Sequence, residues 1–198
     1  METPITLDKM TAPPLPLHRF SVEEYRRLGE LGVLTSEDRV ELLEGWIVEK
    51  MNQRPIHGFI VRLLNETFQR ELPDGWLCQC QLPIATARSE PEPDIAILRG
   101  EHADFRNEHP RGEDCELIIE VADTSLDKDR AKAAVYAAAG VREYWIVNVT
   151  GKCVERYDFR HSTSVASERI DPANSPDSSL SITIGSKLIE LDLRACFD

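Results

Sequence analysis

Two acidic side chains interrupt apolar stretches of the sequence in a way that predicts a metal site. Glu120 lies within the apolar run ELIIEV, and Asp94 lies in EPDIAIL, which reads as a second strand. An isolated carboxylate in an apolar core is costly, and a metal ion or a paired cation is the usual compensation. Because a lysine-bearing helix follows, these residues suggest a metal-dependent hydrolase.

The alternation of side chains along a strand indicates how these acids are placed. Glu120 shares its face with Ile118 and Ala122, and the strand is otherwise apolar on both faces. Such a strand is typically central and covered on both sides. Asp94 begins its strand directly after Pro93. If the two strands are neighbours, their carboxylates, a backbone carbonyl and water make a suitable Mg²⁺ site.

Each of these residues has an ordinary alternative. Glu120 could lie at a frayed strand end or pair with a structural arginine, and Asp94 could be a turn residue. Lys132 stands on an alanine-rich helix and could be a solvated surface lysine. If that helix packs across the strands, however, its ammonium could reach the metal, orient water and offset charge on a phosphate.

Helices and strands interleave along the chain, which predicts an α/β fold with a mixed sheet flanked by helices. A capping box at Ser21 opens a helix that ends at Leu31-Gly32, apolar spacing indicates a helix over 56–71, and Asp129 can cap a helix that stops at Gly140. A hairpin is expected around Glu44-Gly45, further strands at 76–86, 92–100, 115–121, 141–149, 152–159, 181–184 and 187–193, and loops over 101–114 and 161–180. Residues 1–17 are expected to form a flexible arm, and residues 18–198 a single domain.

Composition limits the classes of partner and compartment. The net charge of −12 opposes non-specific binding to nucleic acid, although a local basic groove can exist on an acidic protein. The five cysteines are odd in number and scattered, which predicts free thiols rather than disulfides or a zinc site. No signal-peptide h-region and no apolar stretch of membrane-spanning length is present, so a cytoplasmic protein is expected.

Several motifs resemble the Uma-two family of endonucleases, within the PD-(D/E)-x-K nuclease superfamily. The most specific are EPDIAIL, EVADTSLDKDRAK and YAAAGVREYWIV, and the resemblance runs from ELLEGWIVEKM to KLIELDL. It implies a restriction-endonuclease-like core with the metal held by Asp94 and Glu120. The superfamily lysine usually stands two residues after the glutamate, where this chain has Ala122. Uma-two members carry it on the next helix instead, which matches Lys132, although D-R-A-K is one residue shorter than the family's usual D-R-x-x-K.

Two further residues match positions of the family. Glu41 lies in ELLEG, which resembles the family's E-L-x-x-G hairpin, and it could bind a second ion or a metal-bound water, or be solvated. His57 opens a helix where the family often carries histidine, and it could contact the site or be a structural hydrogen-bonding group. The aromatic side chains of Tyr144 and Trp145 are expected in the core.

These observations lead to a functional hypothesis and an alternative. The hypothesis is a Mg²⁺- or Mn²⁺-dependent endodeoxyribonuclease, with Asp94, Glu120 and the Val121 carbonyl as metal ligands and Lys132 positioning the attacking water. A homodimer is expected, because cutting both strands suits two-fold symmetry. The alternative is a catalytically inactive nuclease-like scaffold that serves as a protein-interaction or regulatory module, which the net charge and the missing lysine at Ala122 favour.

Overall fold

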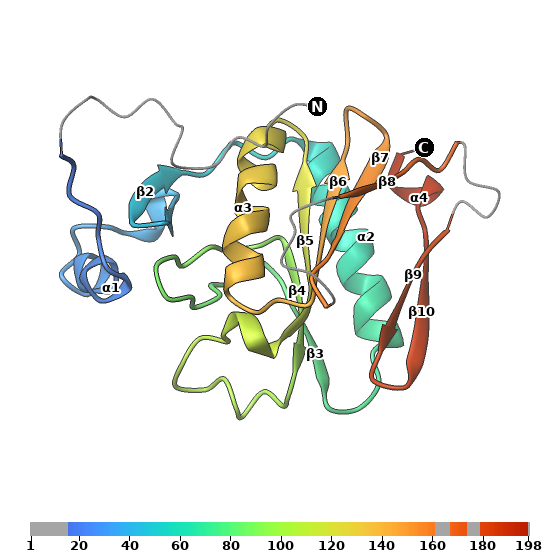
Figure 1. The fold of residues 1–198 in the computed structure, drawn as a ribbon, viewed down its shortest axis with the longest axis horizontal. Helices are drawn as coiled ribbons and strands as arrows, with labels where there is room; N and C mark the ends of the chain where they lie inside the picture. The colour runs from blue at the N-terminus through green and yellow to red at the C-terminus, as the bar shows by residue number, and fades with distance from the viewer. Residues whose placement is uncertain (1–15, 161–166, 174–178, 198) are drawn as a thin grey trace.

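The computed structural model describes residues 16–160, 167–173 and 179–197 (Figure 1). Its centre is a six-stranded sheet in the order β3-β4-β5-β6-β7-β8. β5 and β6 are parallel, and the other neighbours are antiparallel. The strands of this sheet are β3 (Trp76–Gln79), β4 (Ile95–Arg99), β5 (Cys115–Ala122), β6 (Glu143–Asn148), β7 (Cys153–Asp158) and β8 (Glu168–Ile170). The predicted α/β fold with a mixed sheet is therefore confirmed.

Two helices cover the two faces of this sheet (Figure 1). α2 (Pro55–Glu71) buries Ile60, Leu64 and Phe68 in a cluster that also contains the hairpin of β9 (Ser179–Ile184) and β10 (Lys187–Asp192). On the other face, α3 (Leu126–Ala138) packs Ala133 and Tyr136 against the sheet. Because α3 connects the two parallel strands β5 and β6, these three elements form a βαβ unit.

The side chains of β5 alternate between these two clusters as the sequence predicts. Leu117, Ile119 and Val121 belong to the α2 cluster, and Ile118 and Ala122 belong to the α3 cluster. Glu120 lies between Ile118 and Ala122 on the same face of β5, so its side chain faces α3. Tyr144 and Trp145 are buried in the core, also as expected.

A smaller unit of α1 (Val22–Glu30), β1 (Val40–Leu43) and β2 (Trp46–Glu49) lies beside the sheet (Figure 1). The capping box at Ser21 and Glu24 is present. The predicted hairpin is also present, with positive φ at both Glu44 and Gly45, as a tight turn of two residues requires. Short turns of 3₁₀ helix at Ser36–Asp38 and Gly112–Asp114, and α4 (Arg194–Phe197), complete the described elements.

The structure corrects several predicted boundaries, and β4 begins at Ile95 rather than at Asp94. α3 begins at Leu126 with Ser125 as its N-cap, so Asp129 lies inside the first turn, where it accepts a hydrogen bond from Ser125 Oγ. The strand predicted over 76–86 stops at Gln79, because Gln81 takes a left-handed φ of 50° and Pro83 has no N–H to donate. The predicted loop over 161–180 contains β8, which pairs with β7.

Some expectations fall outside what the structure describes. Residues 1–15 of the expected arm lie outside the described residues, as do residues 161–166 and 174–178 of the predicted loop. Within the described segments, no helix is both long enough and apolar enough to cross a membrane.

The packing of Gly112 against the end of α3 gives a stability prediction. A Cβ at this position would lie 2.4 Å from the carbonyl oxygen of Ala139 and 2.5 Å from its Cβ. Gly112→Ala is therefore expected to destabilise the protein by about 1–3 kcal/mol through overpacking. The matched control is Gly29→Ala in α1, where no atom outside the helix lies within 4 Å and alanine is the better helix former. Urea unfolding of both variants tests this, and equal midpoints would contradict it.

Candidate active site

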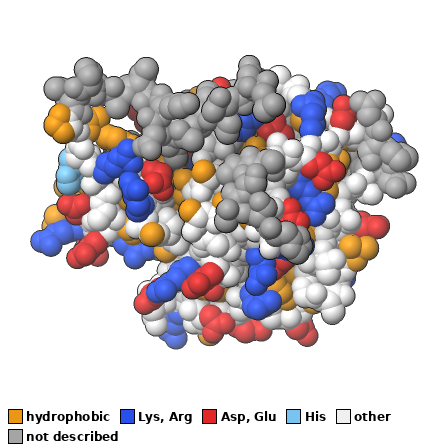
Figure 2. Space-filling model, in the orientation of Figure 1, with side chains coloured by type: hydrophobic (Ala, Val, Ile, Leu, Met, Phe, Trp, Pro, Cys, Tyr) orange, Lys and Arg blue, Asp and Glu red, His pale blue; other side chains and the backbone are white. Residues whose placement is uncertain are grey.

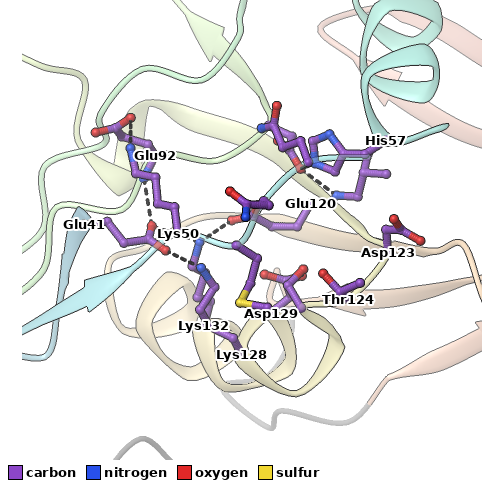
Figure 3. A pocket seen from close by; sticks show the side chains of 16 residues that line it. Glu41, Lys50, His57, Glu92, Glu120, Asp123, Thr124, Lys128, Asp129 and Lys132 are labelled. Carbon is purple, nitrogen blue, oxygen red and sulfur yellow. Dashed lines mark hydrogen bonds and ion pairs between the residues drawn. The ribbon is translucent and has the colours of Figure 1, made fainter. Parts of the chain in front are cut away.

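A small cavity forms where β4, β5, α2, α3 and the β1–β2 hairpin meet (Figure 3). Its volume is about 60 Å³, which is room for an ion with a few waters but not for a nucleotide. The side chains that the sequence singled out all line it: Glu41, His57, Asp94, Glu120 and Lys132. The fold therefore brings together residues that lie up to 91 positions apart, from Glu41 to Lys132.

Glu120 is held by two side chains from α3. Lys132 Nζ lies 2.9 Å from Glu120 Oε1, and the hydroxyl of Tyr136 donates to the same oxygen at 3.0 Å. Lys132 and Tyr136 are four residues apart, so they share one face of the helix. Lys132 is only 2% exposed, which excludes a solvated lysine, and the cation beside Glu120 is this lysine rather than an arginine.

Asp94 lies just beyond the end of the β4–β5 ladder. The last backbone pair is Ile95 with Ile119, and Asp94 Oδ2 then accepts the N–H of Val121 at 2.8 Å. The same oxygen lies 3.0 Å from His57 Nε2. Asp94 thus enters the cavity beside the strand that carries Glu120.

Glu41 lies between two lysines of α3. Its Oε1 is 3.0 Å from Lys128 Nζ, and its Oε2 is 3.0 Å from Lys132 Nζ. Burial alone would raise the pKa of Glu41, but Lys132 and Lys128 outweigh it and lower the pKa to about 2. At 1% exposure, Glu41 is a buried ion-pair partner rather than a solvated strand residue.

Buried acids outnumber the cations inside the site. Burial raises the pKa of Glu120 to about 8, with Lys132 opposing the shift and Asp129 and Asp94 adding to it. Burial likewise raises the pKa of Asp129. Four buried acidic side chains, Glu41, Asp94, Glu120 and Asp129, therefore lie around the buried Lys132 and the partly exposed Lys128. Such a site attracts a further cation.

Asp129 and Lys128 are among the lining residues that the sequence analysis did not assign to the site. Asp129 was expected to cap a helix, yet it is buried and lines the cavity. Lys128 lines it as well and pairs with Glu41. Their spacing from Lys132 could have identified them, because residues three and four positions apart lie on the same face of a helix.

The chemistry of the donors fits a divalent cation. Asp94 and Glu120 offer carboxylate oxygens, and no hydrogen bond from a described residue reaches Glu120 Oε2. Within the described part of the chain, no three His, Cys, Asp or Glu side chains form a ready-made metal cluster. Mg²⁺ is often bound through only one or two carboxylates while retaining waters, so two acids satisfy its requirement.

Glu41 carries a testable pH dependence. Its folded-state pKa of about 2 lies below the ordinary 4.5, so its stabilisation is complete above pH 4.5 and is lost as the pH falls towards 2. Glu41→Gln is therefore expected to lower the free energy of unfolding by up to about 3 kcal/mol at neutral pH. This difference between parent and variant should disappear as the pH falls. Urea unfolding of parent and variant between pH 2 and pH 7 measures it. A gap that stays constant down to pH 2 would contradict the assignment.

Comparison with known proteins supplies context for this geometry. A family model described as "Uma2: Putative restriction endonuclease" matches residues 22–188. A crystal structure from Anabaena variabilis ATCC 29413, described as a putative nuclease belonging to DUF820, matches with a TM-score of 0.69 and 17% sequence identity. The match covers 90% of this chain and 97% of that chain, which shows that the two proteins share a fold. No curated protein matches the chain.

Proposed function

The chain belongs to the Uma2 family, and from that premise we propose that it is a metal-dependent endonuclease that hydrolyses phosphodiester bonds in DNA. One observation carries the proposal. Asp94, directly before β4, and Glu120, on the neighbouring β5, line a single cavity that also contains the buried Lys132. This arrangement supplies the two acids and the lysine that the family resemblance implies, with Lys132 in place of the lysine missing at Ala122.

Asp94 and Glu120 would hold Mg²⁺ or Mn²⁺, with the backbone carbonyl of Val121 as a third ligand. The N–H of Val121 points to Asp94, and the carbonyl of a strand residue points to the same edge as its N–H. Among the residues that the structure describes, no backbone group pairs with that edge beyond the end of β4, which supports the carbonyl as a ligand. When bound, the cation would polarise the scissile phosphate and lower the pKa of a bound water.

Lys132 would act as a permanent positive charge. Burial alone would lower its pKa, but Glu120 and Glu41 raise it well above the usual value. A lysine that stays protonated donates hydrogen bonds and does not remove a proton from water. We therefore assign it the tasks of holding Glu120, orienting the attacking water and reducing the repulsion between the acids and a phosphate. In-line attack would leave a 5′-phosphate and a 3′-hydroxyl.

His57 would orient Asp94. Its Nε2 contacts Asp94 Oδ2, and its Nδ1 is buried without a hydrogen-bond partner among the described residues. Burial lowers the pKa of His57, but the hydrogen bond and charge of Asp94 outweigh it and raise the pKa overall. We further propose that the protein acts as a cytoplasmic homodimer, because two-fold symmetry would place one site on each DNA strand.

A second candidate function is a catalytically inactive scaffold that binds other proteins. The net charge of −12 favours it. On the face in Figure 2, acidic and basic side chains are also interspersed rather than gathered into a basic surface. The buried Lys132 argues against it, since an abandoned site has no need of a lysine held between two acids.

A cleavage assay separates the two candidates. Supercoiled, linear and single-stranded DNA are incubated with the protein in Mg²⁺ and in Mn²⁺, beside Glu120→Gln and a metal-free control. The proposal expects metal-dependent cleavage by the parent alone. Activity that persists with chelator, or that is equal in the variant, would reject it. A complete lack of cleavage together with a lack of Mn²⁺ stabilisation would favour the scaffold.

A further inference from the structure

Two lysines stand at the mouth of the cavity and differ from Lys132 in exposure. The side chains of Lys128 and Lys50 are 18% and 26% exposed, against 3% for Lys132. Lys128 Nζ also lies 3.5 Å from the carbonyl oxygen of Glu49, the residue before Lys50. The end of β2 and the first turn of α3 therefore lie side by side, and each contributes a partly exposed lysine to the lining of the cavity (Figure 3).

Both lysines can exchange their present partners for another anion. Lys128 pairs with Glu41, which would keep Lys132 if Lys128 moved away. Lys50 pairs with Glu92, whose side chain is partly exposed and can be hydrated. Neither exchange would leave a buried charge without a partner, which is the expensive outcome. Lys132 cannot exchange its partner in this way, because its departure would leave the buried Glu120 without a cation.

A second, larger cavity begins at the same place. It lies between α1 and the β1–β2 hairpin and has a volume of about 490 Å³, large enough for a nucleotide. Lys50 and Glu92 line both cavities, so the two spaces meet at this ion pair. The lining is largely polar and charged: its other cations are Arg39 and Arg26, of which Arg26 pairs with Glu90, and its acids are Glu90 and Glu92. This chemistry suits a polyanion and not an apolar ligand.

We propose that Lys50 and Lys128 bind a phosphate that flanks the scissile bond, and that the DNA strand continues over Lys50 into the cavity beside α1. This inference rests on the proposed nuclease function. The phosphate would replace Glu41 as the partner of Lys128 and Glu92 as the partner of Lys50. Ammonium groups bind phosphate as point charges, so the contact positions the strand without reading its sequence. It also explains how an acidic protein could bind DNA through a few local cations.

The dependence of binding on salt tests this subsite. The affinity for a fluorescent single-stranded oligonucleotide is measured without metal at several salt concentrations, in the Glu120→Gln background to prevent cleavage. Each lost phosphate contact lowers the slope of log K against log salt by about 0.7 for a single strand. Lys50→Gln combined with Lys128→Gln removes both cations from this one phosphate contact and is therefore expected to lower the slope by about 0.7 and to weaken binding about 10-fold or more at low salt. The single variants should each give about half of the slope change.

The control is Arg70→Gln. Arg70 is at the end of α2 with its side chain 65% exposed, pairs with Glu71, and lines neither cavity. Arg70→Gln removes the same charge from the chain as Lys50→Gln does. An equal fall in the slope of log K against log salt for these two variants would therefore overturn the subsite. A parental slope in the double variant would also overturn it.

The binding measurement keeps the subsite separate from the proposed function. If the parent cleaves DNA with Mn²⁺ while the double variant retains the parental slope, the subsite is wrong and the nuclease stands. If the slope falls as expected but the parent never cleaves, the strand-binding site is supported and the nuclease function is rejected. A parent that binds no oligonucleotide at low salt would reject the subsite. The two lysines are substituted singly as well as together, so a misfolded double variant leaves two informative proteins.

Discussion

Glu120→Gln is expected to lower the rate of DNA cleavage by about 100-fold or more. The metal-free variant should be as stable as the parent or more stable. The substitution removes a ligand of the proposed cation but leaves Lys132 paired with Glu41. Because the folded-state pKa of Glu120 is raised to about 8, its charged form costs stability as the pH rises from 4.5 to 8. The advantage of the variant should grow across that range.

Thermal melts with and without Mn²⁺ measure both halves of this result. The parent should gain stability from Mn²⁺, and Glu120→Gln should not. Glu116→Gln is the matched control, since Glu116 lies on the same strand and pairs with the half-exposed Arg142 away from the cavity. A structural Glu120 predicts the opposite pattern, which is a large drop in metal-free stability with an unchanged response to Mn²⁺.

Lys132→Met is expected to destabilise the metal-free protein by about 3–5 kcal/mol and to eliminate cleavage. Two buried carboxylates, Glu41 and Glu120, would lose the cation that lies within 3.0 Å of each. Mn²⁺ should restore part of the lost stability, because it would compensate the same negative charge. Lys128→Met serves as the comparison, with an expected cost below about 1 kcal/mol, since Glu41 keeps Lys132.

Urea unfolding with and without Mn²⁺ distinguishes the two lysines. Equal losses in the free energy of unfolding for Lys132→Met and Lys128→Met would mean that the buried ion pairs do not stabilise the site as described. A Lys132→Met protein that retains full cleavage would remove Lys132 from the mechanism.

Local patterns were enough to predict the parts of the site that lie on one element. The alternation along β5 placed Glu120 on one face with Ile118 and Ala122, and the apolar spacing of residues 56–71 identified the helix that carries His57. These predictions held because each depends only on how side-chain directions repeat within one strand or one helix.

Contacts between distant segments could not be predicted in the same way. The pairing of Glu41 with Lys128 joins residues 87 positions apart and depends on how the β1–β2 hairpin docks against α3. Ser125 and Asp129 are both capping residue types, and the structure selects Ser125 because Asp129 turns into the cavity. β8 is three residues long in a polar segment, and its pairing with β7 is the only feature that makes it a strand.

The most direct test of the central claim is a calorimetric titration of Mn²⁺ into the parent, Asp94→Asn and Glu120→Gln at neutral pH. If these two carboxylates together bind one catalytic cation, as proposed, the parent should bind Mn²⁺ saturably and each variant should bind it at least about 10-fold more weakly. Undiminished Mn²⁺ binding in both variants would contradict the account, whatever their effect on cleavage.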